Sequence, residues 1–459
     1  MIGRLLGPEL TELIHQRAFS QLRDILSRFP PEDISEILAD LAPEDRAVLL
    51  RLLPRELAAD VFEHLGVEEQ ERLLLALGNE QVARILNEME PDDRTALLEE
   101  LPAAATQKLL NLLSPEERKI AVTLLGYPED SIGRRMTPEY VAVKRDWTVA
   151  DVLAYLRQVG RERESLNQLF VVDPQGKLAG AVRLRNVVVA EMEVPVADLL
   201  DTAVIVLRAT DDQETAVETF RKYDRTMLPV VDSLDRLVGV VTVDDVLDVA
   251  TEEVTEDIQK MGAVEALDAP YLETGMLAMI QKRVGWLVLL FLGQMLTASA
   301  MAHYESDLAS ALVLAMFIPL IISSGGNSGA QASTLVIRAM ATSEVRLRDW
   351  LRVFRRELVL GLALGAVLAV IGFLRIAFWP NRETLYTSHY QRVAMVVGLS
   401  LVGVVAFGSL VGAMLPFGLR RLKLDPATCS APFVATLVDV SGLIIYFSIA
   451  QLVLRGALL

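Results

Sequence analysis

Cysteine and histidine are scarce in this sequence of 459 residues. Cys429 is its one cysteine, so neither an intramolecular disulfide nor a zinc site with several cysteines can form. The four histidines are scattered along the chain, and no pattern pairs a nucleophile with a base. We therefore expect a protein that is not an enzyme.

A secretion signal is also lacking. The first residues, MIGRLLGPELTELIHQ, are amphipathic and acidic, and they contain neither a long apolar core nor a small-residue cleavage site. We expect the N-terminal half of the chain to stay in the cytoplasm.

Basic residues are outnumbered by acidic residues in the first part of the chain. Residues 1–285 hold 53 of the 61 acidic residues and 31 of the 44 lysines and arginines, a net charge of −22, whereas residues 286–459 carry a net +5. Nucleic acid binds basic surfaces, so this balance argues against nucleic acid as a partner. Cations fit the acidic half better. The alternative is that the acids only keep the chain soluble.

Short leucine-rich segments recur at close intervals between residues 9 and 125. Many of them open with proline followed by acids, which suits the free N–H groups and the dipole at a helix start. The clearest such starts are Pro31, Pro43, Pro54, Pro91 and Pro115. Each helix is too short to be stable alone, so neighbouring helices must stack. We predict an all-α superhelical N domain over residues 1–126.

Residues 127–250 change character, because two units repeat the order helix, strand, strand, helix. The strands are expected at 169–173 and 177–182 in the first unit, and at 227–232 and 237–242 in the second. This α/β pattern resembles a tandem pair of cystathionine-β-synthase-type (CBS) domains. Residues 251–283 show no β pattern, and their acids have helical spacing. We predict a connecting helix there that leads into the membrane.

The last part of the chain is apolar. Stretches long enough to span a membrane lie near 284–302, 308–341, 355–379, 392–418 and 427–454. They predict a five-helix transmembrane domain over residues 284–459. Basic residues at 282–283, 346–356 and 420–423 share one side, which the positive-inside rule makes cytoplasmic. The expected protein is a multi-pass protein of the bacterial inner membrane, with the N-terminus in the cytoplasm and the C-terminus outside.

Asp439 is a carboxylate inside the last predicted span. A charge at membrane depth is unfavourable unless it faces water, a cation or a partner. Asp439 is therefore a candidate oxygen ligand in a cation pathway. The alternative is a protonated aspartate that bonds to a serine or threonine.

Small residues interrupt the second span at residues 323–331, which include three glycines. Such a segment can break the helix, so that backbone carbonyls and the Asn327 side chain line a water-filled path. Pro319 and Pro432 would support kinks near that path. The alternative is close helix packing through small residues.

Acids dominate residues 201–273, where 18 of them stand against 6 basic residues. Like charges repel unless counter-ions lie between them. A divalent cation shared by these acids would therefore hold the second CBS unit and the connecting helix together, and its loss would release them. The alternative is a solvated acidic face.

Thr242 and Asp245 stand three residues apart after the last expected strand of the second CBS unit. In CBS pairs such a threonine and acid often contact a nucleotide ribose. The first unit has Arg183 and Asn186 at the matching places. ATP is therefore a candidate ligand of the CBS pair.

Together these segments resemble the MgtE family of magnesium transporters. The likeness covers nearly the whole chain and rests on residues 127–143, 255–260, 325–329 and 432–442, in that order. It implies a Mg²⁺-selective channel, built as a homodimer with the pore on its two-fold axis. It also implies that Asp439 binds a hydrated Mg²⁺ in the pore, since Mg²⁺ gives up its waters reluctantly. The implied pore-lining positions are Gly325, Gly326, Asn327, Pro432 and Ala435.

The resemblance further implies that cytoplasmic Mg²⁺ closes the channel by bridging the N domain, the CBS pair and the connecting helix. The matching acids are Asp60, Asp92, Glu214, Asp224, Asp245, Asp248, Glu253 and Glu256. Ala96 stands where the family often has a further acid, which would weaken Mg²⁺ binding by the N domain. At the CBS pair, Arg185, Thr242 and Asp245 match nucleotide-contacting positions, but Asn186 and Arg225 depart from the family pattern.

Two other functions compete with a Mg²⁺ channel. A CBS-regulated membrane sensor of Mg²⁺ without transport would use Asp439 structurally. A CBS-bearing anion channel would need basic or N–H groups at mid-membrane, and none stands out in the third to fifth spans.

Overall fold

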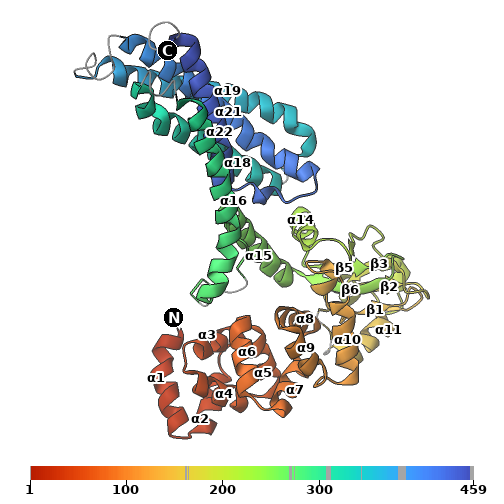
Figure 1. The fold of residues 1–459 in the computed structure, drawn as a ribbon. Coiled ribbons are helices and arrows are strands. Elements are labelled where there is room, and N and C mark those ends of the chain that lie inside the picture. The colour runs from red at the N-terminus through yellow and green to blue at the C-terminus, as the bar shows by residue number, and fades with distance from the viewer. Residues whose placement is uncertain are drawn as a thin grey trace. The chain divides into compact units, whose positions relative to one another are not determined.

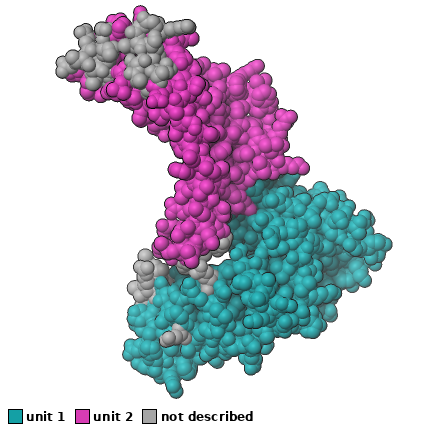
Figure 2. Space-filling model, viewed as in Figure 1, with its two compact units in different colours: residues 1–252 teal, residues 253–459 magenta. Residues whose placement is uncertain are grey.

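The computed structural model describes residues 2–160, 163, 165–267, 271–272, 274–305, 312–342, 344–380 and 389–454. The chain divides into two compact units, residues 1–252 and residues 253–459, which Figure 2 shows in teal and magenta. Each unit has its own hydrophobic core.

Short helices build the first part of unit 1, the N domain (Figure 1). Helices two apart along the chain pack on one another: α3 on α5, α5 on α7, α4 on α6, α6 on α8 and α8 on α10. Leucines from successive helices share one continuous core, which confirms the predicted superhelical array. The helices are α1 (Ile2–His15), α2 (Phe19–Leu26), α3 (Pro31–Ala39), α4 (Pro43–Leu52), α5 (Arg55–Glu63), α6 (Val67–Ala76), α7 (Asn79–Glu88), α8 (Pro91–Glu100), α9 (Ala103–Leu110) and α10 (Pro115–Leu125).

The proline starts of these helices are also confirmed, with one shift. Pro31, Pro43, Pro91 and Pro115 are the first residues of α3, α4, α8 and α10, where a missing N–H leaves no hydrogen bond unmade. Pro54 instead precedes α5 as its N-cap residue.

Two matching three-stranded sheets form the rest of unit 1. In the first sheet β1 (Ala142–Val143) runs parallel to β2 (Gln168–Val172), which pairs antiparallel with β3 (Leu178–Arg183). The second sheet repeats this order with β4 (Leu207–Arg208), β5 (Met227–Val231) and β6 (Leu237–Thr242). Helices α11 (Val149–Val159), α12 (Leu184–Val189), α13 (Val196–Leu199) and α14 (Gln213–Tyr223) accompany them. The tandem CBS prediction is therefore confirmed, with strand bounds within two residues.

The two CBS units share a small core of their own. Phe170 and Ala181 from the first sheet pack with Met227 and Val240 from the second. Gly180 on β3 packs closely on the segment that leads into the second unit, because a Cβ added there would lie 2.7 Å from the carbonyl oxygen of Asp201. The pair is thus one packed body rather than two separate modules.

The connecting helix expected over residues 251–283 has different bounds in the structure. Helix α15 (Val243–Met261) begins directly after β6 and carries the last CBS helix and the connecting segment without a break. It ends where Ala263 takes a left-handed φ of 57°, with the Val264 N–H bonded back to the carbonyl of Gln259. Residues 268–270 and 273 lie outside the described residues. The next helix begins at Met276.

Among the described residues of unit 2, five helices are long and apolar enough to cross a membrane, which confirms the predicted number of spans. They are α16 (Met276–His303), α18 (Ile318–Ala341, preceded by the short helix Leu312–Phe317), α19 (Trp350–Ala377), α21 (Tyr390–Arg421) and α22 (Ala431–Leu454). Residues 308–311 of the second expected span lie outside the described residues. Helix α21 packs against α18, α19 and α22 and forms the centre of the bundle, whereas α16 packs mainly on α22.

The expected break in the second span is not found. Helix α18 runs unbroken through residues 323–331, and Pro319 sits in its first turn, so it causes no kink. Its glycines serve close packing: a Cβ at Gly408 would lie 2.3 Å from the carbonyl oxygen of Gly325, and one at Gly412 would lie 2.0 Å from that of Gly329. The alternative of small-residue packing is therefore the correct one for this segment.

Candidate cation sites

Asp439 lies on α22, half-buried in the bundle. Its Oδ2 accepts a hydrogen bond of 2.6 Å from Nε2 of Gln294 on α16. A carboxylate in a spanning segment therefore has a neutral amide as its neighbour, and no serine or threonine hydroxyl is among the described hydrogen-bond donors to it. The alternative expected from the sequence, a protonated aspartate bonded to a serine or threonine, is therefore not the arrangement seen among the described residues.

The predicted pore-lining positions divide into two groups. Gly326 on α18 faces Ala435 on α22, since a Cβ at Gly326 would lie 3.5 Å from the Ala435 Cβ. Asn327 follows Gly326 with an exposed side chain. Gly325 instead packs inside the bundle, where its Cβ would lie 2.5 Å from Val404. Gly326 and Ala435 therefore meet one helical turn before Asp439, while Gly325 serves helix packing within the chain.

Pro432 is the second residue of α22, so it does not kink the helix. It lines an open cavity of about 640 Å³ between α16 and α22, together with Ala435 and Gln294. The cavity is otherwise mostly apolar.

A lysine joins the end of α15 to the loop before α22 within unit 2. Nζ of Lys260 lies 2.6 Å from Glu256 Oε1 and 2.7 Å from Asp425 Oδ2. Burial lowers the pKa of Lys260, but its hydrogen bonds to Asp425 and Glu256 outweigh that effect and raise the pKa. Asp257 beside them has its pKa raised to about 6 by burial and by the charge of Asp425. The last turns of α15 are thereby tied to the segment that starts the Asp439 helix.

Acids from three helices crowd together in unit 1. Burial and the charge of Asp93 raise the pKa of Glu63, at the end of α5, to about 8. Burial and the charges of Glu90, Asp248 and Asp244 raise the pKa of Asp93 on α8 to about 6. The N domain and the start of α15 therefore face each other with carboxylates. We call Glu63, Glu90, Asp93, Asp244, Asp245 and Asp248 the acidic cluster.

Several predicted regulatory acids fall in or beside this cluster, and others do not. Asp245 and Asp248 belong to it, and the raised pKa of Asp60 reflects burial and the charges of Glu56 and Glu32. Asp92 is buried in α8 with 5 % of its surface exposed. Glu214 and Asp224 lie at opposite ends of α14, and Glu253 and Glu256 belong to unit 2.

The sequence analysis did not identify four members of the cluster: Glu63, Glu90, Asp93 and Asp244. Asp93 adjoins Asp92 in the first turn of α8, and spacing alone does not tell which of two consecutive acids faces the partner. Glu63 follows Asp60 by one helical turn, which was a usable signal. Its Oε1 accepts the Glu90 N–H at 2.8 Å, so it ties α5 to the start of α8.

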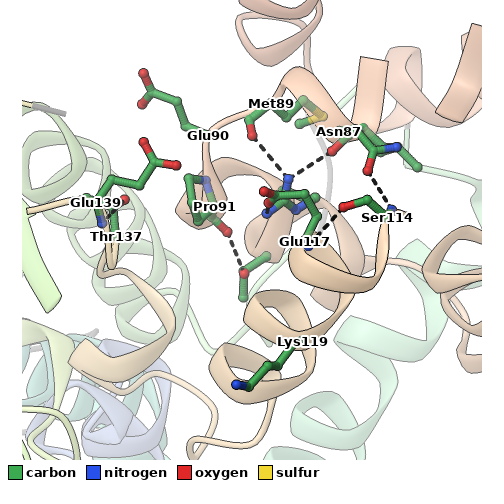
Figure 3. Close-up of polar contacts among 12 residues, drawn as sticks. Asn87, Met89, Glu90, Pro91, Ser114, Glu117, Lys119, Thr137 and Glu139 are labelled. Carbon is green, nitrogen blue, oxygen red and sulfur yellow. Dashed lines mark hydrogen bonds and ion pairs between the residues drawn. The ribbon is translucent and has the colours of Figure 1, made fainter. Parts of the chain in front are cut away.

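A second polar group lies where the N domain meets the start of the CBS pair (Figure 3). Glu139, in the segment before β1, points its carboxylate toward Glu90, and burial together with the charge of Glu117 raises its pKa. Arg94 is fully buried and donates to the carbonyls of Leu86 at 2.9 Å and Met89 at 3.2 Å, while it pairs with Glu117. This arginine stabilises the turn that presents Glu90.

The nucleotide candidates are dispersed. Thr242 donates from its hydroxyl and from its N–H to Asp245 Oδ2, so Asp245 caps the start of α15. Arg185 is exposed on α12. A cavity of about 20 Å³ between the CBS units is lined by Arg183 and Arg225, among others, and by none of the three candidates.

The crowded acids predict a dependence of stability on pH. The folded pKa values of Glu63 (about 8), Asp93 (about 6) and Asp245 (about 6) lie above the unfolded values of 4.5 and 3.8. The folded state therefore binds protons first, and stability rises as pH falls through this range. Without Mg²⁺, we expect the thermal midpoint of the full chain to rise by about 5 °C from pH 9 to pH 5.

Differential scanning fluorimetry at several pH values checks this expectation. Millimolar Mg²⁺ should flatten the curve if a cation shares the cluster, because it would neutralise the carboxylates instead of protons. An identical slope with and without Mg²⁺ would favour the solvated acidic face.

No group of three or more histidine, cysteine, aspartate or glutamate side chains is arranged to hold a bare metal ion, within the part of the chain that the structure describes. The acids are close enough to repel one another but not placed as a direct ligand shell.

Fold and sites together define a class: a five-span membrane protein joined to an acidic helical domain and a CBS pair. Family models agree along the chain. A model of the MgtE intracellular N domain matches residues 29–130, the CBS domain model matches residues 130–193 and 196–252, and the MgtE model, described as a divalent cation transporter, matches residues 318–449.

Curated relatives and solved structures extend the match. The magnesium transporter MgtE of Thermus thermophilus is 43% identical over 98% of this chain and 99% of its own length. That of Bacillus subtilis is 31% identical over 95% of each chain. The crystallised cytosolic domain of the Mg²⁺ channel MgtE, in complex with ATP, is 40% identical, with a TM-score of 0.51, over 52% of this chain and 98% of that one. The crystallised soluble part of a magnesium transporter is 30% identical, with a TM-score of 0.52, over 55% and 99%. The chain belongs to the MgtE family.

Proposed function

We propose that this chain conducts Mg²⁺ across a membrane, with Asp439 as the cation site in the pathway. The observation that carries the proposal is the half-buried Asp439 carboxylate on a spanning helix, one turn beyond the meeting point of Gly326 and Ala435. The 43% identity to a magnesium transporter over nearly the whole chain supports the choice of cation. A carboxylate with nearby small residues leaves room for an ion that keeps its waters.

Cytoplasmic Mg²⁺ closes the channel in this proposal. A hydrated Mg²⁺ at the acidic cluster would offset the repulsion among Glu63, Asp93 and Asp245, and would hold the N domain against the start of α15. The other predicted regulatory acids would act at further contacts of the same kind. Helix α15 reaches the loop before α22 through Lys260 and Asp425, which gives a physical route from the sensor to the Asp439 helix.

The proposed assembly is a homodimer in the bacterial inner membrane, with the N-terminus in the cytoplasm and the C-terminus outside. Helix α16 supports contact with lipid or a second copy, because none of its most apolar window is buried within the chain. The basic residues at 282–283, 346–356 and 420–423 support the orientation.

ATP is proposed as a modulator at the CBS pair. A relative 40% identical to this chain was crystallised with ATP, and the Arg183 and Arg225 side chains lining the cavity between the CBS units offer positive charge to phosphates. Thr242 and Asp245 are proposed as ribose contacts.

Mg²⁺ flux into liposomes that contain the purified full chain tests the proposal. We expect saturable uptake when the protein's cytoplasmic side holds little Mg²⁺, and a lower uptake when that side holds millimolar Mg²⁺. No uptake under either condition would support a sensor without transport. The same assay with ATP tests the CBS pair, since an unchanged response to Mg²⁺ would discard ATP as a modulator.

A further inference from the structure

Helices α16 and α22 cross at a point set by a glycine. A Cβ added at Gly293 would lie 2.5 Å from Cγ2 of Thr436, closer than side-chain atoms approach in folded proteins. The absence of a side chain at Gly293 therefore allows the two helix backbones to approach and fixes their register. Gln294, the next residue on α16, is placed beside Asp439, which follows Thr436 by about one turn of α22.

Gln294 uses this position to bond the Asp439 carboxylate. Gln294 Nε2 donates this hydrogen bond to Asp439 Oδ2 over 2.6 Å. In the described chain it is the one hydrogen bond that this carboxylate receives. The two residues are 145 positions apart, so the contact joins the first and last spanning helices.

The amide also faces the cavity between α16 and α22. Leu287, Phe291, Pro432 and Ala435 make much of that wall apolar, and Gln294 is one of its two polar lining residues. The other, Thr436, donates its hydroxyl to the carbonyl of Pro432 within its own helix. With Nε2 committed to Asp439, the carbonyl oxygen of Gln294 remains an acceptor for water molecules around a cation.

We propose that Gln294 is a positioning residue of the cation pathway: its amide holds the Asp439 carboxylate in one orientation and sets the Mg²⁺ concentration at which conduction saturates. A neutral donor favours the ionised carboxylate without adding a charge that would repel or trap the ion. This inference rests on the proposed role of Asp439. The competing role is structural, because hydrogen bonds between spanning helices also hold bundles together.

Flux measurements on Gln294→Met separate the two roles. Methionine has nearly the same length and volume but donates no hydrogen bond, so the carboxylate loses its restraint. We expect the half-saturating Mg²⁺ concentration to rise about tenfold, the usual scale for one hydrogen bond to a charged group, while maximal flux and the thermal midpoint change little. The matched control is Gln281→Met, the same replacement on the same helix, outside the cavity.

Each outcome distinguishes the positioning role of Gln294 from the structural role. A lower thermal midpoint with unchanged half-saturation would show a structural bond and overturn the inference, as would a Gln294→Met curve identical to the control. If Gln294→Met does not accumulate, Gln294→Asn carries the test, because its amide is one methylene too short to reach Asp439 and the same rise is expected. If Asp439→Asn leaves flux unchanged, the proposed function fails instead, whatever Gln294 does.

Discussion

Asp439→Asn is expected to lower Mg²⁺ conduction by about 100-fold or more while the protein still folds and inserts. The replacement keeps the shape of the side chain and its ability to accept from Gln294, but it removes the charge that attracts a divalent ion in a low-dielectric setting. A loss of about 3 kcal/mol in attraction corresponds to this factor. Flux in liposomes at several external Mg²⁺ concentrations measures it, with size-exclusion profiles to confirm folding.

The matched control for this replacement is Glu357→Gln. Glu357 is a half-buried carboxylate on the spanning helix α19, and it lies outside the α16, α18 and α22 contacts that surround Asp439. Losing this charge should change conduction by less than about twofold relative to the unchanged protein, because substitutions away from a functional site usually have small energetic effects. Equal losses in both variants would point to a general effect of charge in the bundle, and full conduction by Asp439→Asn would remove Asp439 from the pathway.

The sequence predicted the architecture well because its signals are local. Pro31, Pro91 and Pro115 mark helix starts through a property of one residue. The CBS pair is marked by short apolar strand runs that recur in the same order in both units. Helix α18 shows the limit of this reasoning. The glycines from Gly325 to Gly329 suggested a break, and only the position of Gly408 and Gly412 on α21 shows that they allow close packing instead.

The candidate sites were harder to predict because their contacts join distant parts of the chain. Lys260 meets Asp425 across 165 residues, and no spacing rule connects them. Asp439 was found because a lone acid in an apolar run is conspicuous, whereas its neighbour Gln294 is an unremarkable polar residue in another span. Which of Asp92 and Asp93 faces α15 depends on the rotation of α8, and that rotation is set by packing on α6 and α10.

Neutralising the acidic cluster should change gating without changing conduction itself. In Asp245→Asn with Asp248→Asn, two of the carboxylates that crowd Asp93 lose their charge, so bound Mg²⁺ would contribute less to holding the N domain against α15. We expect the Mg²⁺ concentration that halves flux from the cytoplasmic side to rise about tenfold, within the usual range for coupled sites. Maximal flux at low cytoplasmic Mg²⁺ should equal that of the unchanged protein.

A double variant with the same loss of charge gives the control for this gating prediction. Glu191→Gln with Asp198→Asn removes two exposed acids of the first CBS unit, away from the cluster, and should close at the normal concentration. If both double variants shift equally, the total charge of unit 1 governs the response. If neither shifts, the cluster is a solvated face, and the stability curve should then show no Mg²⁺ dependence either. Repulsion between carboxylates is local, because salt screens it over a short distance. A change in the closing Mg²⁺ concentration that occurs in the Asp245 and Asp248 variant alone would therefore connect the crowded carboxylates to closure.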